Sequence, residues 1–338
     1  MPEAYTHIRI ARACARRLES SGADAFIRGE ALAEAYEMGA QGPDPLFAFR
    51  ILSRKKPYPM AALADRIHTR QCGAFLRAMV FRAYSPVQRA YTLGFLTHYA
   101  ADATLHPYVE ALRAPGMPFA MPEGHGFCEV ALDTRFHESD GLGPAVKGEE
   151  VAPPLYTDAL AHVCALLHAC ALEVYGEDVS AEYLADAFHD FRWLHEKIFP
   201  ATPAKRALVW LAERLVLRRP GYGLSHMTPA KQPPEGFPDT WTDPVTHMVH
   251  EGEGPQALCD AVARDAAVYC KAAAAYWQGG ADKEHVAMAI GDRSFITGQL
   301  SEQAPAGDGG EENPTAAEDT AGQAAGTARD GPAGAALV

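Results

Sequence analysis

Three residues that can bind a metal recur at regular spacing within the segment GFLTHYAADATLHPY. They are His98, Asp102 and His106, each four positions after the last. An α-helix rises ~1.5 Å and turns ~100° per residue, so these side chains would form one stripe spanning ~12 Å. One ion cannot reach all three. The spacing therefore predicts a row of metal sites in which each residue serves a different ion or neighbouring ones.

A second pair with the same spacing follows in the segment HGFCE. His125 and Glu129 would share one face of a helix, where an imidazole and a carboxylate can chelate one ion. A single histidine is more often a surface or core residue than a ligand. Two such spacings so close together favour metal binding, because a buried stripe of imidazoles and carboxylates is costly without a metal or hydrogen-bond partners.

The other histidines that we considered lack a carboxylate at a matching spacing. A surface or core position is favoured for this set, which comprises His162, His168, His226, His247 and His250. The seven cysteines include no CxxC pair, a pattern typical of reduced thiols. Among them, Cys128 is placed beside Glu129, where it could compete for zinc.

The elements that must position these residues are predicted to be helices. Alanine is abundant, β-branched runs are scarce, and apolar residues recur at helical spacing through most of the first 296 positions. The expected fold class is therefore all-α, a multi-helix bundle. We expect helices over about 6–21, 24–38, 60–82, 86–112, 125–138, 155–174, 180–198, 203–218, 244–278 and 282–296.

The chain is predicted to contain one helical domain, residues 1–296, followed by a tail, residues 297–338. The tail consists mainly of Ala, Gly, Glu, Asp and Pro with almost nothing to bury, which is typical of disorder. Two irregular stretches, Gly39–Pro59 and Arg219–Pro244, interrupt the helices of the domain. Long loops in compact domains are often functional.

Charge and hydropathy exclude several classes of protein. With 43 acidic and 30 basic residues the net charge is −13, which disfavours strong non-specific binding to nucleic acid or anionic lipid. The N-terminal residues lack the basic start and apolar run of a secretory signal, and no stretch approaches the ~18 apolar residues of a membrane span. We therefore expect a cytoplasmic protein without a transmembrane segment.

Several blocks together resemble the bacterial zinc-dependent phospholipase C family, in its leaderless branch. They are GAQGPDPLF around Asp44, the later His68, GFLTHYAADATLHPY and HGFCEVALDTRF, in the family's order. The resemblance covers residues 4–140 well and continues only as a vaguer pattern near Trp241 and Pro244. The family's metal architecture is shared with the trinuclear zinc single-strand nucleases.

The resemblance implies two or three Zn²⁺ ions. The implied ligand sets are Asp44, His68 and His98 for one zinc, His106, His125 and Glu129 for a second, and His7, Asp102 and the N-terminal amine and carbonyl for a third. Trimming of Met1 would free the amine of Pro2 for that role. Secreted members have a longer gap than the three residues between Asp102 and His106, so a different distance between the metal sites is expected.

These residues predict a zinc-dependent phosphodiester hydrolase, phospholipase C-like, because clustered zincs activate water and polarise phosphoryl oxygens. Asp44 is the candidate catalytic base, although it could instead cap the following helix. Glu123 and Asp133 could accept hydrogen bonds from ligand imidazoles or remain solvated charges. The expected substrate is a phospholipid or another phosphodiester.

Two alternatives remain open. A single-strand nuclease or nucleotidase would use the same metals, but the net charge and the lack of an evident basic and aromatic groove make nucleic acid a disfavoured partner. A non-catalytic zinc-binding scaffold would have every metal position closed by protein ligands. The sequence leaves the oligomeric state open.

Overall fold

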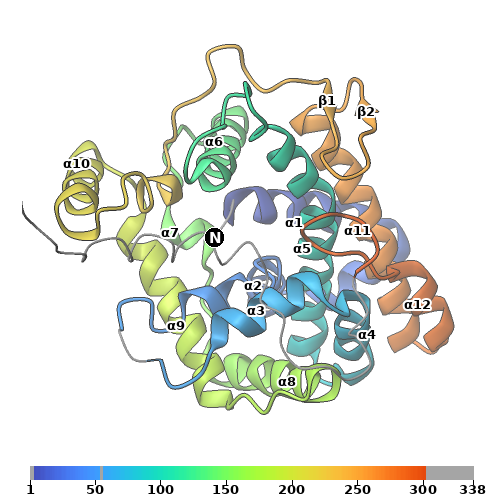
Figure 1. The fold of residues 1–338 in the computed structure, drawn as a ribbon. Helices are drawn as coiled ribbons and strands as arrows, with labels where there is room; N and C mark the ends of the chain where they lie inside the picture. Colours follow the sequence, from blue (N-terminus) through green and yellow to red (C-terminus); the bar gives the residue numbers. More distant parts are fainter. Residues whose placement is uncertain (1–3, 54–55, 302–338) are drawn as a thin grey trace, which may run out of the picture. The chain divides into compact units, whose positions relative to one another are not determined.

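The computed structural model describes residues 4–53 and 56–301, which belong to one structural unit. These residues form α-helices and a single two-stranded antiparallel sheet, so the all-α prediction is confirmed (Figure 1). The α-helices are α1 (Ala4–Leu18), α2 (Glu30–Gly39), α3 (Met60–Thr69), α4 (Cys72–Arg82), α5 (Pro86–Ala111), α6 (Gly124–Ser139), α7 (Gly148–Val151), α8 (Thr157–Tyr175), α9 (Ala181–Ile198), α10 (Pro203–Ala212), α11 (Pro255–Trp277) and α12 (Lys283–Ile290).

Shorter elements connect these helices. Four are 3₁₀-helical turns: η1 (Glu19–Ser21), η2 (Ala23–Ile27), η3 (Asp44–Ala48) and η5 (Leu224–His226). A π-helical turn, η4 (Glu213–Leu217), continues α10. The strands β1 (Trp241–Thr242) and β2 (Val249–His250) pair with Trp241 opposite His250.

The helix α5 lies at the centre of this unit and carries the stripe of predicted ligands. It begins with a capping box, in which Gln88 N donates to Ser85 Oγ and Ser85 N donates to Gln88 Oε1, both at a distance of 3.2 Å. Its side chains are buried around most of its circumference, because α1, α2, α8 and α11 all pack against it. The ligand stripe therefore sits in the interior of the bundle.

Two glycines let α2 and α5 cross in close contact. A Cβ atom at Gly39 would lie 2.1 Å from the carbonyl oxygen of Tyr91, and one at Gly94 would lie 1.9 Å from that of Tyr36. Any larger residue would push the two backbones apart. This crossing brings the loop after α2, which contains Asp44, against the ligand stripe of α5.

Two predicted helices are each broken into two elements. The segment 24–38 divides into η2 and α2 at Gly29, whose φ of +100° lies outside the helical region. The segment 60–82 divides into α3 and α4 at Gln71, whose φ is +51°. At that break the carbonyl of His68 accepts a hydrogen bond from Phe295 N at a distance of 2.9 Å. A distant segment thus supplies the donor that the next turn of a continuous helix would have supplied.

The predictions for the C-terminal third were less accurate. The segment expected to be helical from 244 begins with the turn that follows β1 and with the strand β2, and α11 starts only at Pro255. The helix expected over 282–296 ends at Ile290, because Gly291 has a φ of +68°. Residues 297–301, assigned above to the tail, take part in the fold, since Ser301 N donates to Asp292 O over 2.9 Å. The remaining predicted tail, residues 302–338, lies outside the described residues.

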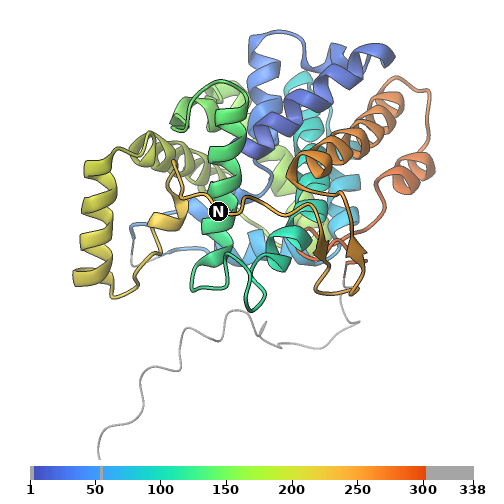
Figure 2. The same ribbon diagram turned by 90° about the horizontal axis from the view of Figure 1, so that it is seen from above.

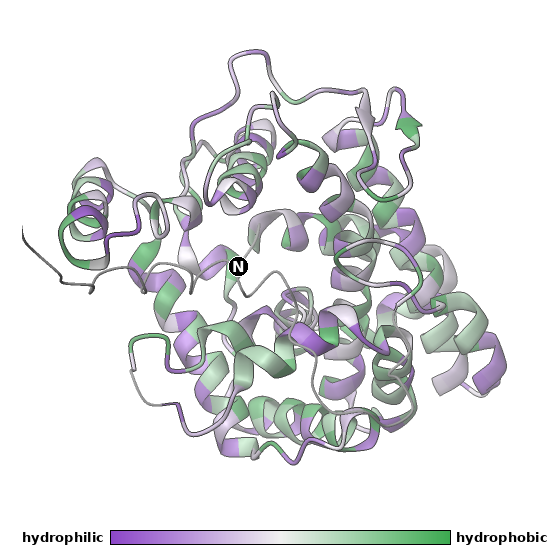
Figure 3. Ribbon diagram, in the orientation of Figure 1, coloured by the Kyte–Doolittle hydropathy of each residue, from purple (hydrophilic) through white to green (hydrophobic). Residues whose placement is uncertain are grey.

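By length and composition α8 could cross a membrane, and within the described parts of the chain no other helix could. Its buried residues pack against α4, α5 and α9. Figure 3 shows the largely apolar ribbon of α8 alongside these neighbours.

Candidate metal centre

All eight predicted ligand residues come together inside the bundle, although they derive from five separate elements. Their nitrogen and oxygen atoms form three groups, within each of which the ligand atoms lie within 4.8 Å of one another. The groups are His7, His98 and Asp102; Asp44, His68 and His98; and His106, His125 and Glu129. We call these the first, second and third group.

The first and second groups share His98. Its ring stacks on that of His7, with centroids 4.3 Å apart and planes at 30°. In the second group, His68 Nε2 lies 3.4 Å from Asp44 Oδ1. The spacing predicted that each residue of the stripe serves a different ion or neighbouring ones, and His98 faces two neighbouring groups. The resemblance had assigned His98 to one zinc only.

Asp102 belongs to the first group and also faces the other two. Its two carboxylate oxygens face the Nε2 atoms of four histidines, at distances of 2.9–3.9 Å: His98, His7, His68 and His106. One carboxylate can therefore serve two adjacent ions, one through each oxygen. The short gap between Asp102 and His106 places His106 one helical turn further along the same face.

The third group forms where α6 crosses the end of α5. His125 Nε2 lies 2.7 Å from Glu129 Oε1, and His106 Nε2 lies 3.5 Å from the same oxygen. The side chain of His125 is 34% exposed, whereas those of the other seven residues are at most 6% exposed. The third group is therefore the one that solvent reaches most directly.

Four of the five histidines direct Nε2 into the centre because Nδ1 is held from behind. His98 donates to the carbonyl of Ala40 (3.2 Å) and His68 to that of Ala64 (2.8 Å). In the third group, His106 donates to the carbonyl of Phe295 (2.9 Å). His125 donates to the Glu110 carboxylate (2.7 Å). Metal-binding histidines are oriented by such outer acceptors.

These acceptors were missed by the sequence analysis. Glu110 carried a usable signal, because it continues the stripe of His98, Asp102 and His106 at the same spacing of four. The backbone carbonyls carried none, since any residue supplies one. Phe295 is 189 positions from His106, and only the tertiary fold brings the two together.

Buried ligand atoms without a hydrogen-bond partner indicate that these residues fit a bound cation. Several buried ligand atoms accept or donate no hydrogen bond among residues 4–53 and 56–301: His98 Nε2, His106 Nε2, Asp44 Oδ1, Asp102 Oδ2 and both oxygens of Glu129. Buried polar atoms are rarely left this way in native proteins. Imidazole nitrogens and carboxylate oxygens are among the usual ligands of Zn²⁺, so these residues fit a zinc ion.

Without an ion the groups are strongly polarised. Burial alone would raise the pKa of Asp102, but His98 and His106 hold it well below its ordinary value. Burial opposes the protonation of His68 and His125, yet the neighbouring carboxylates outweigh it and raise the pKa of His68 to about 10 and that of His125 to about 9. Burial lowers the pKa of His7 to about 4. A metal ion binds only the neutral form of an imidazole, so His68 and His125 would release their protons when an ion binds.

Gly42 packs closely against the ring of His98, which the first and second groups share. It has a φ of +55°, and a Cβ atom there would lie 2.1 Å from Cδ2 of the His98 ring. A side chain at this position would displace the imidazole. The loop after α2 thus positions His98 both by this close approach and by the carbonyl of Ala40.

Asp133 corrects one expectation. It contacts none of the ligand imidazoles and instead caps α1, accepting hydrogen bonds from Tyr5 N (2.9 Å), Thr6 N (2.7 Å) and Thr6 Oγ1 (2.8 Å). A carboxylate at a helix N-terminus stabilises the orphan N–H groups there. Burial raises the pKa of Asp133 to about 7. It therefore acts on the first group by fixing the helix that carries His7.

The remaining expectations are settled by position. Glu123 occupies the N-cap position of α6 with a φ of +57°, and its side chain makes no capping hydrogen bond. Asp44 is buried at the start of η3 and likewise makes no capping hydrogen bond, so the capping alternative was wrong. The five histidines set aside above belong to none of the three groups. Pro2, the predicted terminal ligand, lies outside the described residues.

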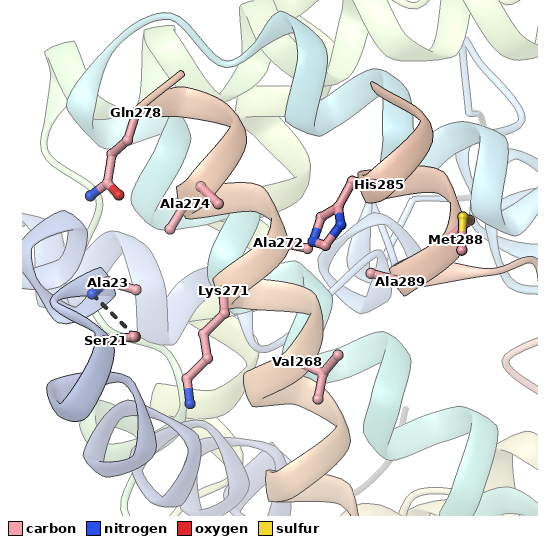
Figure 4. A pocket seen from close by; sticks show the side chains of 11 residues that line it. Ser21, Ala23, Val268, Lys271, Ala272, Ala274, Gln278, His285, Met288 and Ala289 are labelled. Carbon is pink, nitrogen blue, oxygen red and sulfur yellow. Dashed lines mark hydrogen bonds between the residues drawn. The ribbon is translucent and has the colours of Figure 1, made fainter. Parts of the chain in front are cut away.

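A surface cavity lies apart from this centre. It has a volume of about 620 Å³ and lies between α11, α12 and the turns after α1, with Lys271, His285 and Met288 at its margin (Figure 4). None of the eight ligand residues lines it. It therefore contributes nothing to the three groups.

Comparison with known proteins agrees with this geometry. Residues 6–190 match the family model described as zinc dependent phospholipase C. The match includes all eight residues of the three groups. No curated protein and no solved structure matched the sequence.

Proposed function

We propose that this chain, which belongs to the zinc-dependent phospholipase C family, hydrolyses a phosphodiester of a phospholipid or related compound. The observation that carries the proposal is the continuity of the three groups. His98 belongs to two of them, and Asp102 faces histidines of all three. Adjacent ions are the arrangement that phosphoester hydrolysis uses.

The three groups would hold two or three Zn²⁺ ions. When bound, zinc supplies Lewis acidity, which lowers the pKa of a coordinated water and polarises phosphoryl oxygens. Among the described residues each group has three ligand residues, a number that would leave a coordination position for substrate or water, as in catalytic zinc sites. A closed structural site would need a fourth protein ligand in each group.

Asp44 is the residue that we propose as general base. Its carboxyl is buried, and although burial alone would raise its pKa, the neighbouring His98 and His68 lower it. The side chain is therefore an anion at neutral pH and can accept a proton from an attacking water. His68, which lies 3.4 Å from it, restricts its orientation.

The third group is proposed to receive the phosphoryl group of the substrate. His125 has the most exposed side chain of the eight ligand residues, so an ester group can approach there. Glu110 holds His125 from the outer side and keeps its Nε2 turned inward. Glu110 is accordingly a positioning residue.

A substrate panel tests this function. The zinc-loaded chain is assayed on a monodisperse chromogenic phosphodiester, on mixed micelles of phosphatidylcholine and on single-stranded DNA. The proposal expects zinc-dependent release of phosphorylated headgroup, with little cleavage of DNA. Preferential cleavage of DNA would support the nuclease alternative, and zinc binding without any turnover would support the scaffold alternative.

A further inference from the structure

The helix α10, with the turn η4 that follows it, is poorly covered by the rest of its unit. In α10 no residue is buried, and both Figure 1 and Figure 2 show it at the periphery. This segment lies beyond residues 6–190, the part of the chain that matches the family. Nothing in the proposed hydrolysis explains it.

One face of this segment is apolar and exposed. Ala204, Leu208, Leu211 and Leu215 follow the spacing i, i+4, i+7 and i+11, which places them on one side of a helix. The leucine side chains are exposed by 68%, 46% and 70% in chain order. Trp210 and Val216, which follow or precede these leucines in sequence, are also exposed.

The opposite face attaches the segment to the molecule by polar contacts. Arg206 Nη1 donates to the carbonyls of Met227 (2.7 Å) and Pro229 (2.8 Å). Glu213 is buried and accepts hydrogen bonds from the backbone N–H groups of Gly221 (2.9 Å), Leu224 (3.1 Å) and Gly223. The apolar face is thus held outward by anchors on the other side.

The charge of the segment is opposite to that of the chain. Residues 203–219 contain five basic side chains, Lys205, Arg206, Arg214, Arg218 and Arg219, and a single acid, Glu213. Arg214 lies over the ring of Trp210, 4.8 Å from its centroid. The rest of the chain is strongly acidic, so this is a local positive region on a negatively charged protein. Figure 3 shows both polar and apolar stretches along its ribbon.

A helix of this length gains little stability from its own hydrogen bonds. Its start is well capped, since Thr202 accepts from Lys205 N and Pro203 occupies the first turn. Even so, helices shorter than ~12–15 residues are marginal in water unless an apolar face is packed. An apolar environment on the leucine side would stabilise it.

We propose that α10 and η4 dock on an anionic lipid surface, with the leucine face in the acyl region and the arginines at the headgroups. An exposed apolar stripe flanked by Arg and Lys, with Trp beside it, is the pattern of helices that lie in a membrane interface. The inference deepens the proposed function by placing the surface where the enzyme meets its substrate. Lipid binding itself does not require turnover.

Vesicle flotation tests the proposal on the full zinc-loaded chain, in short incubations on ice. We expect binding to vesicles of phosphatidylcholine with one third phosphatidylglycerol, little binding to phosphatidylcholine alone, and weaker binding at high salt. The triple variant Leu208→Glu, Leu211→Glu, Leu215→Glu should lose about tenfold or more of the affinity. The pair Arg214→Gln, Arg218→Gln should weaken binding and reduce its salt dependence.

A matched control is the pair Val268→Glu, Met288→Glu, which changes exposed apolar residues on α11 and α12 and should bind like the parent. Equal vesicle binding by the leucine variant and the parent would overturn the proposal. So would a self-association in sedimentation that the leucine variant abolishes while the parent ignores vesicles, since the face would then join two copies.

Failure of this proposal is distinguishable from failure of the proposed function. Turnover of the monodisperse phosphodiester should be the same in the parent and in the leucine variant, because α10 lies outside the three groups. Loss of turnover on vesicles alone supports lipid docking. A parent that binds vesicles but hydrolyses neither substrate would refute the hydrolase and leave the docking surface intact.

Discussion

His98 and Asp102 stand one helical turn apart on α5, and their side chains bring Nε2 and Oδ2 to 2.9 Å. Neither atom has a hydrogen-bond partner among the described residues. Two buried polar atoms so close, and so incompletely satisfied, indicate that a cation belongs beside them. Because His98 serves two groups and Asp102 faces all three, damage at this pair should spread beyond one ion.

The sharing of His98 predicts unequal metal loss. His98→Ala should lower zinc content by up to two equivalents, because it removes a ligand from the first and second groups together. His125→Ala should cost about one equivalent, since it affects only the third group. Inductively coupled plasma mass spectrometry of the purified variants measures both. His189→Ala, an exposed helical histidine, is the control; equal losses at 98 and 125 would contradict the shared site.

The close approach of Gly42 predicts a loss of metal without a change of ligand. Gly42→Ala should displace the His98 ring and reduce zinc content, in addition to a backbone strain of about 1 kcal/mol. Gly141→Ala is matched, because its φ is +78° and no atom lies within 4 Å of the added Cβ. It should be destabilised to a similar degree and keep its zinc. Full zinc occupancy in Gly42→Ala would show that the ring can move without consequence.

The cap of α1 predicts an effect on the first group from a distance. Asp133→Asn replaces one accepting oxygen with an NH₂ group that faces a backbone donor, and should cost about 1 kcal/mol of unfolding free energy. Zinc affinity should also fall, because α1 carries His7. Urea denaturation and competitive zinc titration measure the two effects. Glu123→Gln should change neither, and an unchanged Asp133→Asn protein would remove the proposed link.

The pKa values of His68 and His125 predict how the metal-free protein responds to pH. Both are raised above the ordinary 6.5, so protonation stabilises the fold below about pH 6.5, and that contribution is lost as pH rises through about 9 and then about 10. Zinc-loaded protein holds these imidazoles neutral and should lack the loss. Melting temperatures from pH 7 to 10, with and without chelator, test this. Parallel curves would contradict it.

Part of the candidate site could be predicted from the sequence because helical spacing is a local property. The stripe on α5 and the pair on α6 lie in helices whose bounds were predicted within two residues. His7, Asp44 and His68 came from the resemblance instead, since no spacing relates them to α5. Their meeting depends on the crossing of α2 and α5 at Gly39 and Gly94.

What the sequence could not predict depends on contacts between distant segments. The Phe295 carbonyl accepts a hydrogen bond from His106 Nδ1, and Phe295 N donates to the carbonyl of His68. Phe295 lies in a segment that was expected to be the end of a helix. Breaks at Gly29 and Gln71 were invisible to periodicity, because apolar residues continue on both sides of them. Asp133 looked like a partner for an imidazole because it is near Glu129 in sequence, yet its side chain points to α1.

Our central claim is that this chain hydrolyses a phosphodiester when its three groups hold zinc. Its most direct test is turnover of a chromogenic phosphodiester by the chelated chain during stepwise addition of zinc. We expect no activity in the metal-free protein and a rise in activity that saturates at two or three equivalents of zinc. Saturation of zinc binding at that stoichiometry with no hydrolysis of any phosphoester would contradict it.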